Sequence, residues 1–290
     1  MDRDTRRAVE EYRHAEAGPI ENNLIDELVA GELDRQEFLQ RAGMFGLSLG
    51  SIGMLLRYVG EADVAHAAPV LGKAGGTLRA GITTPASPVE PYLLNDGGTL
   101  AFAGIPGEYL TFTNPQAQVQ PMLATSWKPN KDATVWVFQL RRGVRFHNGK
   151  EMTSADVVAS MKQYVGKGSN AGLSTFFDAA GVSPVGRYAV RFRLKAPLGT
   201  FPYLLSQTTY QVIIQPAAIA AKPGTWLKSG MIGTGAYKLK SYTEKKGAEL
   251  VRNNAYWGGR PAMDGIKVTF FTGSAPLVLA LRGGQIDLAM

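Results

Sequence analysis

The stretch that decides the fold is residues 123–157, LATSWKPNKDATVWVFQLRRGVRFHNGKEMTSADV. Within it, residues 135–140 alternate with a period of two, which places Trp136, Phe138 and Leu140 on one bulky apolar face. That period predicts a strand covered on at least one side. The following His147-Asn148-Gly149 is typical of a tight turn, because Asn and Gly tolerate positive φ.

A helix is predicted directly after this turn. Thr153-Ser154-Ala155-Asp156 has the spacing of a capping box, in which Thr153 and Asp156 exchange hydrogen bonds with each other's backbone. Asp156 is therefore interpreted as a cap, not a catalyst. Apolar residues then follow at helical spacing and are expected to face the core, namely Val157, Val158, Met161 and Val165.

Further strands and turns are predicted on both sides of this stretch. Residues 75–82, 189–194 and 266–270 alternate as half-buried strands, with Arg191 and Arg193 facing water. A short helix is expected over 274–281, with Gly283 in the left-handed conformation that ends helices. The glycine-rich residues 233–238 lack both the GxxxxGK[ST] pattern and a dinucleotide fingerprint, which argues against a nucleotide site.

Composition predicts a globular chain with an uneven charge distribution. The 290 residues carry 31 Lys+Arg and 24 Asp+Glu and contain no cysteine. Disulfides, thiolate metal sites, a cysteine nucleophile and a lipid-anchoring cysteine are thereby excluded. Residues 1–67 hold 7 basic and 13 acidic residues, so the remaining 24 basic and 11 acidic residues give the rest of the chain a net charge of +13.

The first part of the chain is predicted to be a targeting segment. A polar, acidic, helix-compatible lead precedes the weakly polar run 42–56 and Ala65-His66-Ala67, the small-x-small form of a signal peptidase site. Phe38-Leu39 resembles a twin-arginine export motif, although Gln36 occupies the position of the second arginine. The alternative interpretation is an amphipathic or buried helical hairpin over residues 24–57.

The combined motifs of residues 75–290 resemble the extracytoplasmic solute-binding proteins of peptide and nickel ABC transporters, family 5, the dipeptide- and oligopeptide-binding class. The motifs that carry the resemblance are the stretch 123–157, Gly233-Thr234-Gly235-Ala236-Tyr237, residues 252–258 with Tyr256-Trp257-Gly258, and Gly284-Gln285-Ile286-Asp287. This resemblance implies an α/β, periplasmic-binding-protein-like, bilobed fold of type II (large cluster).

The same resemblance implies a domain organisation. Residues 1–71 form the lead with its signal- or anchor-like segment, and residues 72–290 form a partial solute-binding domain with a subdomain inserted at about 115–195. Only the first lobe, with this extra subdomain, is expected; the second large lobe is missing, as in a truncated or cut receptor. The face toward that lobe is expected to be an exposed apolar or mixed patch.

The implied function is that of a receptor that captures a peptide or related small polar solute outside the membrane and delivers it to the permease subunits of an ABC importer. A monomer is expected, exported to the periplasm or the outer face of the cytoplasmic membrane and membrane-associated through the transporter complex. No cofactor and no metal are implied. Candidate ligand-binding residues, chosen from the resemblance and their loop positions, are Thr84, Ser87, Tyr109, Thr234 and Tyr237; core packing is the alternative for Tyr109.

Three other functions compete with that of a transport receptor. An enzyme is disfavoured, because a Ser-His-Asp triad would have to use His147 and no metal-ligand spacing is present. Nucleic-acid binding is disfavoured because the basic residues are scattered and not clustered with aromatics. A chaperone-like or sensory ligand-binding protein without a transport role remains the alternative, which broad instead of selective binding would reveal.

Overall fold

The computed structural model describes residues 7, 9–13, 17, 19–30, 32, 38, 55, 75–166 and 168–290. The chain divides into two compact units, Met1–Lys73 and Ala74–Met290. The predicted apolar run 42–56, apart from Leu55, lies outside the described residues, and so does Ala65-His66-Ala67. The export segment and the predicted domain bounds therefore stay predictions.

The first unit contains the helix predicted in the acidic lead. Helix α2 spans Pro19–Val29 and buries Leu24, Ile25 and Leu28. These residues recur at helical spacing and so share one face. The guanidinium of Arg13 donates to Asn22 and to Asp26 of the same helix at 3.1 and 2.5 Å. Among the described residues no helix has both the length and the apolar character that crossing a membrane would require.

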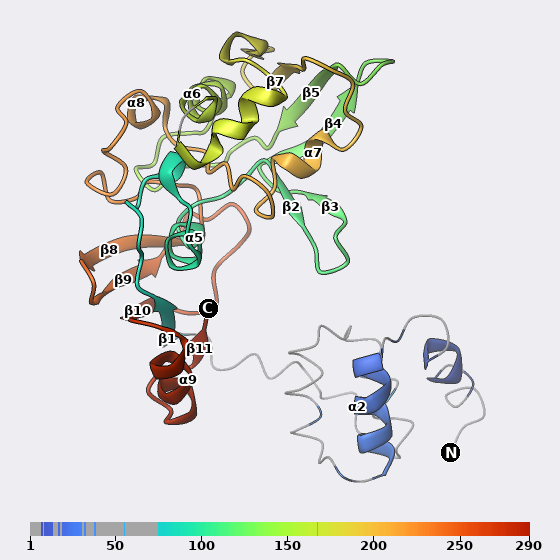
Figure 1. Cartoon of the computed structure of the whole chain (residues 1–290), viewed down its shortest axis with the longest axis vertical. Helices are drawn as coiled ribbons and strands as arrows, with labels where there is room; N and C mark the ends of the chain where they lie inside the picture. The colour runs from blue at the N-terminus through green and yellow to red at the C-terminus, as the bar shows by residue number, and fades with distance from the viewer. Residues whose placement is uncertain are drawn as a thin grey trace. The chain divides into compact units, whose positions relative to one another are not determined.

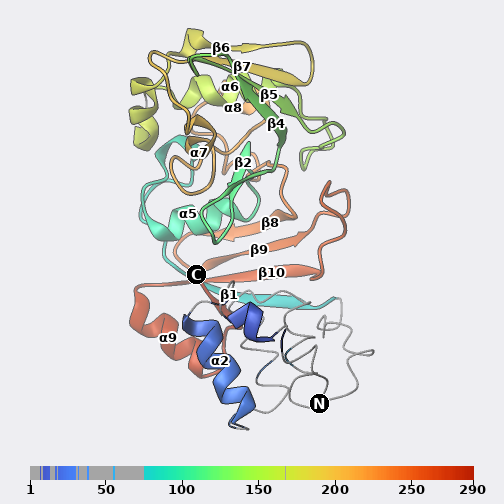
Figure 2. The same ribbon diagram turned by 90° about the vertical axis from the view of Figure 1, so that its right-hand side faces the viewer.

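The second unit is built around a five-stranded mixed sheet, in the order β11-β1-β10-β9-β8 (Figures 1 and 2). Strand β1 pairs in parallel with β10 on one side and β11 on the other, whereas β8, β9 and β10 are antiparallel neighbours. The bounds are β1 Thr77–Thr83, β8 Tyr237–Thr243, β9 Gly247–Arg252, β10 Gly265–Phe271 and β11 Leu288–Ala289. Strands predicted at 75–82 and 266–270 are thus confirmed as β1 and β10.

A second sheet has four antiparallel strands in the order β4-β5-β7-β6. Its strands are β4 Ala124–Pro129, β5 Val135–Leu140, β6 Val182–Pro184 and β7 Ala189–Arg193, and a small pair is formed by β2 Thr111–Thr113 and β3 Val119–Pro121. Trp136, Phe138 and Leu140 are buried as their alternation predicted. The exposed Arg191 and Arg193 confirm the prediction for β7.

Helices cover both sheets. Helix α5 (Gly97–Gly104) packs Phe102 against Tyr242 and Phe270, whereas α9 (Ser274–Arg282) buries Leu277 with Phe271 and Ile286. Short segments complete the unit: η2 Pro91–Leu93, η3 Gly168–Thr175, η4 Ala179–Gly181, α7 Phe201–Leu204 and α8 Ala217–Ala220. A Cβ on Gly81 would lie 2.5 Å from the terminal methyl groups of Leu277 and Ile286, so these two side chains pack closely over the glycine and would have to shift to admit a larger residue.

Helix α6 (Ser154–Tyr164) confirms the predicted capping box. The Asp156 carboxylate accepts from the backbone N–H of Thr153 at 2.8 Å and from that of Ala217, at the start of α8, at 2.8 Å. Asp156 therefore caps one helix and fixes a second. The prediction for the end of α9 is wrong in detail, because Gly283 has φ −80° and Gly284, with φ 66°, is the left-handed residue.

Each sheet has its own hydrophobic core. Phe138 and Phe192 from the four-stranded sheet pack edge to face at 5.4 Å, and both contact Phe201 of α7. The second core joins α5 to the five-stranded sheet. On α9 and β11, by contrast, large apolar side chains are exposed: Val278, Leu279, Leu281 and Leu288. The predicted patch toward a second lobe stays a prediction, since no partner surface is present to identify it.

Replacing Phe192 by alanine should destabilise the four-stranded sheet strongly. The ring is fully buried and makes edge-to-face contacts with three other aromatic rings, and truncating such a side chain lowers the free energy of unfolding by about 3–5 kcal/mol. Guanidinium unfolding followed by tryptophan fluorescence measures the loss. Phe112→Ala is the matched control, because that ring is 40% exposed; equal losses for the two variants would contradict this account of the core.

Candidate binding face

The carboxyl ends of the parallel strands converge at one edge of the five-stranded sheet. Strand β1 ends at Thr83 and β10 at Phe271, and the backbone N–H of Thr84 donates to the Phe271 carbonyl at 2.8 Å. In open α/β sheets, ligands bind outside the carboxyl ends of the strands, where the order reverses. Here β10 and β11 lie on opposite sides of β1 and are connected through α9, so the end of β1 is such a point.

Two predicted residues lie in the loop that leaves β1. The Thr84 hydroxyl donates to the Phe271 carbonyl at 3.0 Å, and the Ser87 hydroxyl donates to Asp96, the N-cap of α5, at 2.5 Å. Burial alone would raise the pKa of Asp96, but hydrogen bonds from Ser87 and Thr99 outweigh it and hold the pKa far below its usual range. Asp96 is therefore a charged anchor that ties the loop to α5.

A second polar centre is organised around Glu108, whose side chain is 3% exposed. Its Oε1 accepts from the Tyr256 hydroxyl at 2.7 Å, and its Oε2 accepts from the Thr234 hydroxyl and the Trp257 indole N–H, each at 2.7 Å. Burial raises the pKa of Glu108, an effect that these three donors and the charge of Arg141 oppose. Arg141 lies 4.3 Å from the centre of the Trp257 ring.

The turn between Gly233 and Tyr237 is held by His147, by Asn253 and by the backbone at Pro106. His147 Nε2 lies 2.9 Å from the Gly235 carbonyl, and the Gly233 N–H donates to Nδ1 at 3.4 Å, which fits a neutral ring protonated at Nε2. Asn253 Nδ2 donates to the same Gly235 carbonyl at 3.1 Å. A Cβ on Gly233 would lie 2.0 Å from the Pro106 carbonyl, so the close approach of the two chains requires glycine there.

The five predicted binding residues do not form a single cluster. Thr84, Ser87 and Tyr237 are partly exposed. Thr234 is fully buried with its hydroxyl on Glu108, and Tyr109 is 6% exposed in the core, where burial raises the pKa of its hydroxyl far above the usual value. Neither buried side chain presents a free polar group at the surface. A role for the five in binding stays a prediction.

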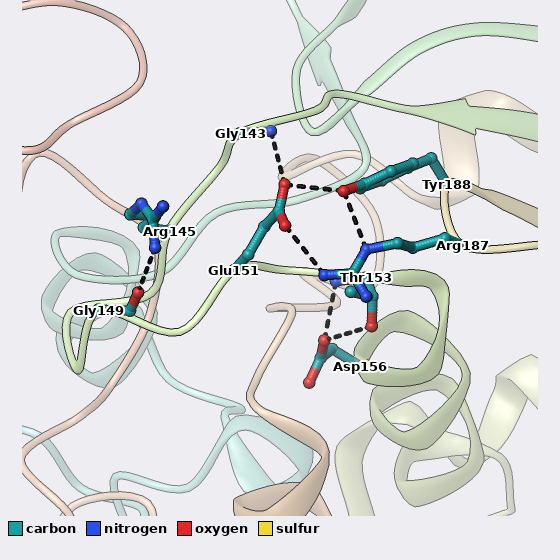
Figure 3. Close-up of polar contacts among 8 residues, drawn as sticks. All are labelled: Gly143, Arg145, Gly149, Glu151, Thr153, Asp156, Arg187 and Tyr188. Atoms are coloured by element: carbon teal, nitrogen blue, oxygen red, sulfur yellow. Dashed lines mark hydrogen bonds and ion pairs between the residues drawn. The ribbon is translucent and has the colours of Figure 1, made fainter.

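The polar residues of the 123–157 stretch also hold one another (Figure 3). Glu151 accepts from the Gly143 N–H, from the Tyr188 hydroxyl and from Arg187 at 3.1, 2.9 and 3.0 Å. In Figure 3, Arg187 and Tyr188 reach toward Glu151 from beside the start of α6, near the capping bonds of Thr153 to Asp156. These contacts give Glu151 and Asp156 structural roles.

The sequence interpretation missed Glu108, His147 and Asn253 as the groups that hold the turn. Glu108 carried a usable signal: it is a lone acidic residue followed directly by Tyr109 and Leu110. A buried carboxylate needs donors, and the hydroxyl and indole of Tyr256-Trp257 supply them. Among the described residues, no group of three histidine or carboxylate side chains is arranged to hold a metal ion.

Comparison with known proteins supplies the family. The model of the bacterial extracellular solute-binding proteins, family 5 (middle region), matches residues 118–290. The chain belongs to this family.

Named relatives are oligopeptide- and dipeptide-binding proteins. The chain is 27% identical over 212 residues to the oligopeptide-binding protein AppA of Bacillus subtilis, a match that covers 68% of this chain and 38% of AppA. It is 29% identical over 175 residues to the probable D,D-dipeptide-binding periplasmic protein DdpA of Escherichia coli, covering 59% of this chain and 34% of DdpA. The chain therefore spans well under half the length of these relatives.

Solved structures show the same fold. Helicobacter pylori DppA in complex with the peptide STSA is 25% identical with a TM-score of 0.61, covering 74% of this chain and 46% of DppA. MoaA from A. tumefaciens R10, in complex with mannopinic acid, is 23% identical with a TM-score of 0.64, covering 75% of this chain and 45% of MoaA. The expected fold is confirmed: the described residues form part of a type II periplasmic binding protein, its first lobe.

Glu108→Gln should destabilise the chain although it conserves shape. In the natural chain both oxygens of Glu108 accept hydrogen bonds from hydroxyl or indole donors. Glutamine replaces one of these oxygens by an NH₂ group, which cannot accept. A buried donor left without an acceptor costs about 1–3 kcal/mol. Urea unfolding measures the change in the free energy of unfolding. Glu249→Gln serves as the control, since Glu249 is an exposed partner of Lys240 and such pairs contribute little. A Glu108→Gln variant as stable as Glu249→Gln would show that the cluster is not structural.

His147 should make stability depend on pH. Burial lowers the pKa of His147 from 6.5 to about 4; a nearby Lys238 acts in the same direction and the hydrogen bond to Gly235 opposes both. Because the pKa of His147 is lower in the folded than in the unfolded chain, the neutral ring stabilises the folded state. This contribution to the free energy of unfolding is complete above pH 6.5 and is lost as the pH falls toward 4.

Between pH 7 and 5 we expect the free energy of unfolding to fall by about 1–2 kcal/mol more in the natural chain than in His147→Gln. Urea unfolding of both proteins at several pH values tests this difference, because every other titrating group is shared. If the free energy of unfolding of the two proteins changed with pH in parallel, His147 would not be a buried neutral ring.

Proposed function

We propose that this chain is the first-lobe part of a solute-binding receptor of an ABC importer, and that its solute is a peptide or a related small polar compound. The observation that carries the proposal is the match of the family 5 model over residues 118–290, together with the first-lobe fold. The peptide preference is supported by relatives named for oligopeptides and dipeptides. MoaA, in complex with mannopinic acid, supports the wider class of small polar solutes.

The proposed binding face is the edge of the five-stranded sheet where β1 and β10 end. Thr84 lies there, whereas Tyr237 begins β8 at the opposite edge of the sheet, directly after the turn that Glu108 and His147 hold. The hydrogen bonds of Thr84 to Phe271 and of Ser87 to Asp96 keep this edge in a fixed shape, which lowers the ordering cost of binding. A ligand would be enclosed only when a second wall closes on this face.

The proposal includes a location and partners. The relatives include proteins named as periplasmic, which supports export of this chain to the periplasm or the outer face of the cytoplasmic membrane. The partners would be permease subunits, contacted after solute capture by a monomer. Nothing in the geometry favours a chaperone-like or sensory role over this one.

Uptake of a labelled tripeptide by cells with and without the gene tests the function. We expect deletion to abolish the saturable part of uptake and re-expression of the gene to restore it, with unlabelled peptides competing and sugars not competing. Unchanged uptake in the deletion strain would contradict the receptor role.

The double variant Thr84→Val, Tyr237→Phe tests two of the candidate binding residues, one at each edge of the sheet, in the same assay. Each change removes one hydroxyl with little change of shape, and two lost hydrogen bonds of about 1 kcal/mol each would lower uptake at low peptide concentration more than tenfold. Tyr188→Phe is the control, because its hydroxyl is bound to Glu151 in the other sheet's subdomain. Equal uptake by both variants would show that neither Thr84 nor Tyr237 takes part in binding the solute.

A further inference from the structure

A cavity of about 530 Å³ lies between the loop that follows β1, the segment 224–228 and the β8–β9 hairpin. Apolar and aromatic side chains form most of its wall, chiefly Pro85, Pro88, Leu93, Leu227 and Tyr242. Its size is in the range of pockets that hold small organic molecules. The cavity is separate from the Glu108 centre, none of whose residues line it.

One carboxylate, Glu90, lies in this wall and is almost completely buried, with 6% of its surface exposed. Its Oε1 receives the backbone N–H of Leu227 at 3.4 Å, a long hydrogen bond. Its Oε2 is buried and has no hydrogen-bond partner among the described residues. A buried carboxylate oxygen without a donor is energetically costly, so this atom is suited to a donor that arrives from outside the chain.

The protein compensates the Glu90 charge mainly through backbone N–H groups. Burial raises the pKa of Glu90, backbone N–H groups of residues 227, 226 and 224 oppose it, and the charge of Lys228 makes the smallest contribution. Lys228 itself is exposed at the rim. Ser87, which also lines the cavity, gives its hydroxyl to Asp96 and not to Glu90. A cationic N–H group that fits inside the cavity would complete the compensation of this carboxylate.

We propose that this cavity is a binding site for a small compound that carries a primary ammonium group on an apolar or aromatic body. The ammonium group pairs with the Glu90 carboxylate, and the body lies along Pro85, Pro88, Leu227 and the ring of Tyr242. A charge-assisted hydrogen bond of this type is stronger than a neutral one. The site does not depend on the transporter role, because every residue that forms it is in this chain.

Binding of phenethylamine to the full chain tests the proposal, measured by isothermal titration calorimetry. The matched probes are 2-phenylethanol, which keeps the body but has no charge, and 3-phenylpropionate, which reverses the charge. We expect phenethylamine to bind at least about tenfold more tightly than 2-phenylethanol, since hydrogen bonds to charged groups contribute about 1.5–3 kcal/mol. Amide resonances of Gly224 and Leu227 should shift on binding, which places the probe in the cavity.

Two pairs of variants locate the site. Glu90→Gln should reduce the preference for phenethylamine over 2-phenylethanol to less than about twofold, whereas Glu244→Gln, at a rim carboxylate, should leave it unchanged. Ala86→Trp should block all binding by filling the cavity, whereas Ala86→Ser should not. Ala86 is exposed, so this second pair remains informative even where Glu90→Gln fails to fold.

Three results would overturn the proposal. The first is equal affinity for phenethylamine and 2-phenylethanol in the natural chain. The second is equal loss of affinity in Glu244→Gln and Glu90→Gln, which would indicate unspecific attraction to surface carboxylates. The third is unchanged binding in Ala86→Trp, which would place the probe elsewhere. None of these outcomes depends on peptide uptake, so failure here is distinguishable from failure of the receptor function.

Discussion

The buried carboxylate of Glu108 is the interaction on which the second unit depends. It receives three donors, Thr234, Tyr256 and Trp257, that are 126, 148 and 149 residues away along the chain. Between Glu108 and these donors the chain builds the entire four-stranded sheet and returns. One satisfied charge therefore fixes where the returning chain re-enters the five-stranded sheet. Removing any one donor would leave a buried charge less compensated, so the contacts are mutually dependent.

Glycine makes this arrangement possible at two points. Gly233 approaches the Pro106 carbonyl so closely that a Cβ would lie 2.0 Å away, and a Cβ on Gly98 would lie 2.1 Å from the carbonyl of Thr83. The first contact sets the turn beside Glu108, and the second sets the start of α5 against the end of β1. In both cases the side chain that is missing, not one that is present, determines how near two backbones lie. The proposed binding face adjoins the second contact, at the end of β1.

What the sequence could predict was local, and what it could not predict was long-range. The alternation of Trp136, Phe138 and Leu140 and the capping box of Asp156 depend on neighbours within a few residues, and both were correct. The end of α9 was off by one glycine, because two adjacent glycines offer the left-handed conformation equally well to local reasoning. The partners of Glu108 could not be predicted, because no periodicity relates residues more than 100 positions apart. Tyr109 shows the same limit, since only its position in the fold decides that its hydroxyl is buried.

Glu90 and Glu108 are both buried carboxylates whose pKa is raised by burial, yet their surroundings differ. Glu108 has short hydrogen bonds to both oxygens, all within the chain, so it is complete as a structural group. Glu90 has one long hydrogen bond and one oxygen without a donor among the described residues, and it lines a cavity. Because burying charge is costly, an incompletely compensated carboxylate in a cavity wall is suited to a group that completes it. The contrast between the two residues is therefore the physical reason to assign one to architecture and the other to recognition.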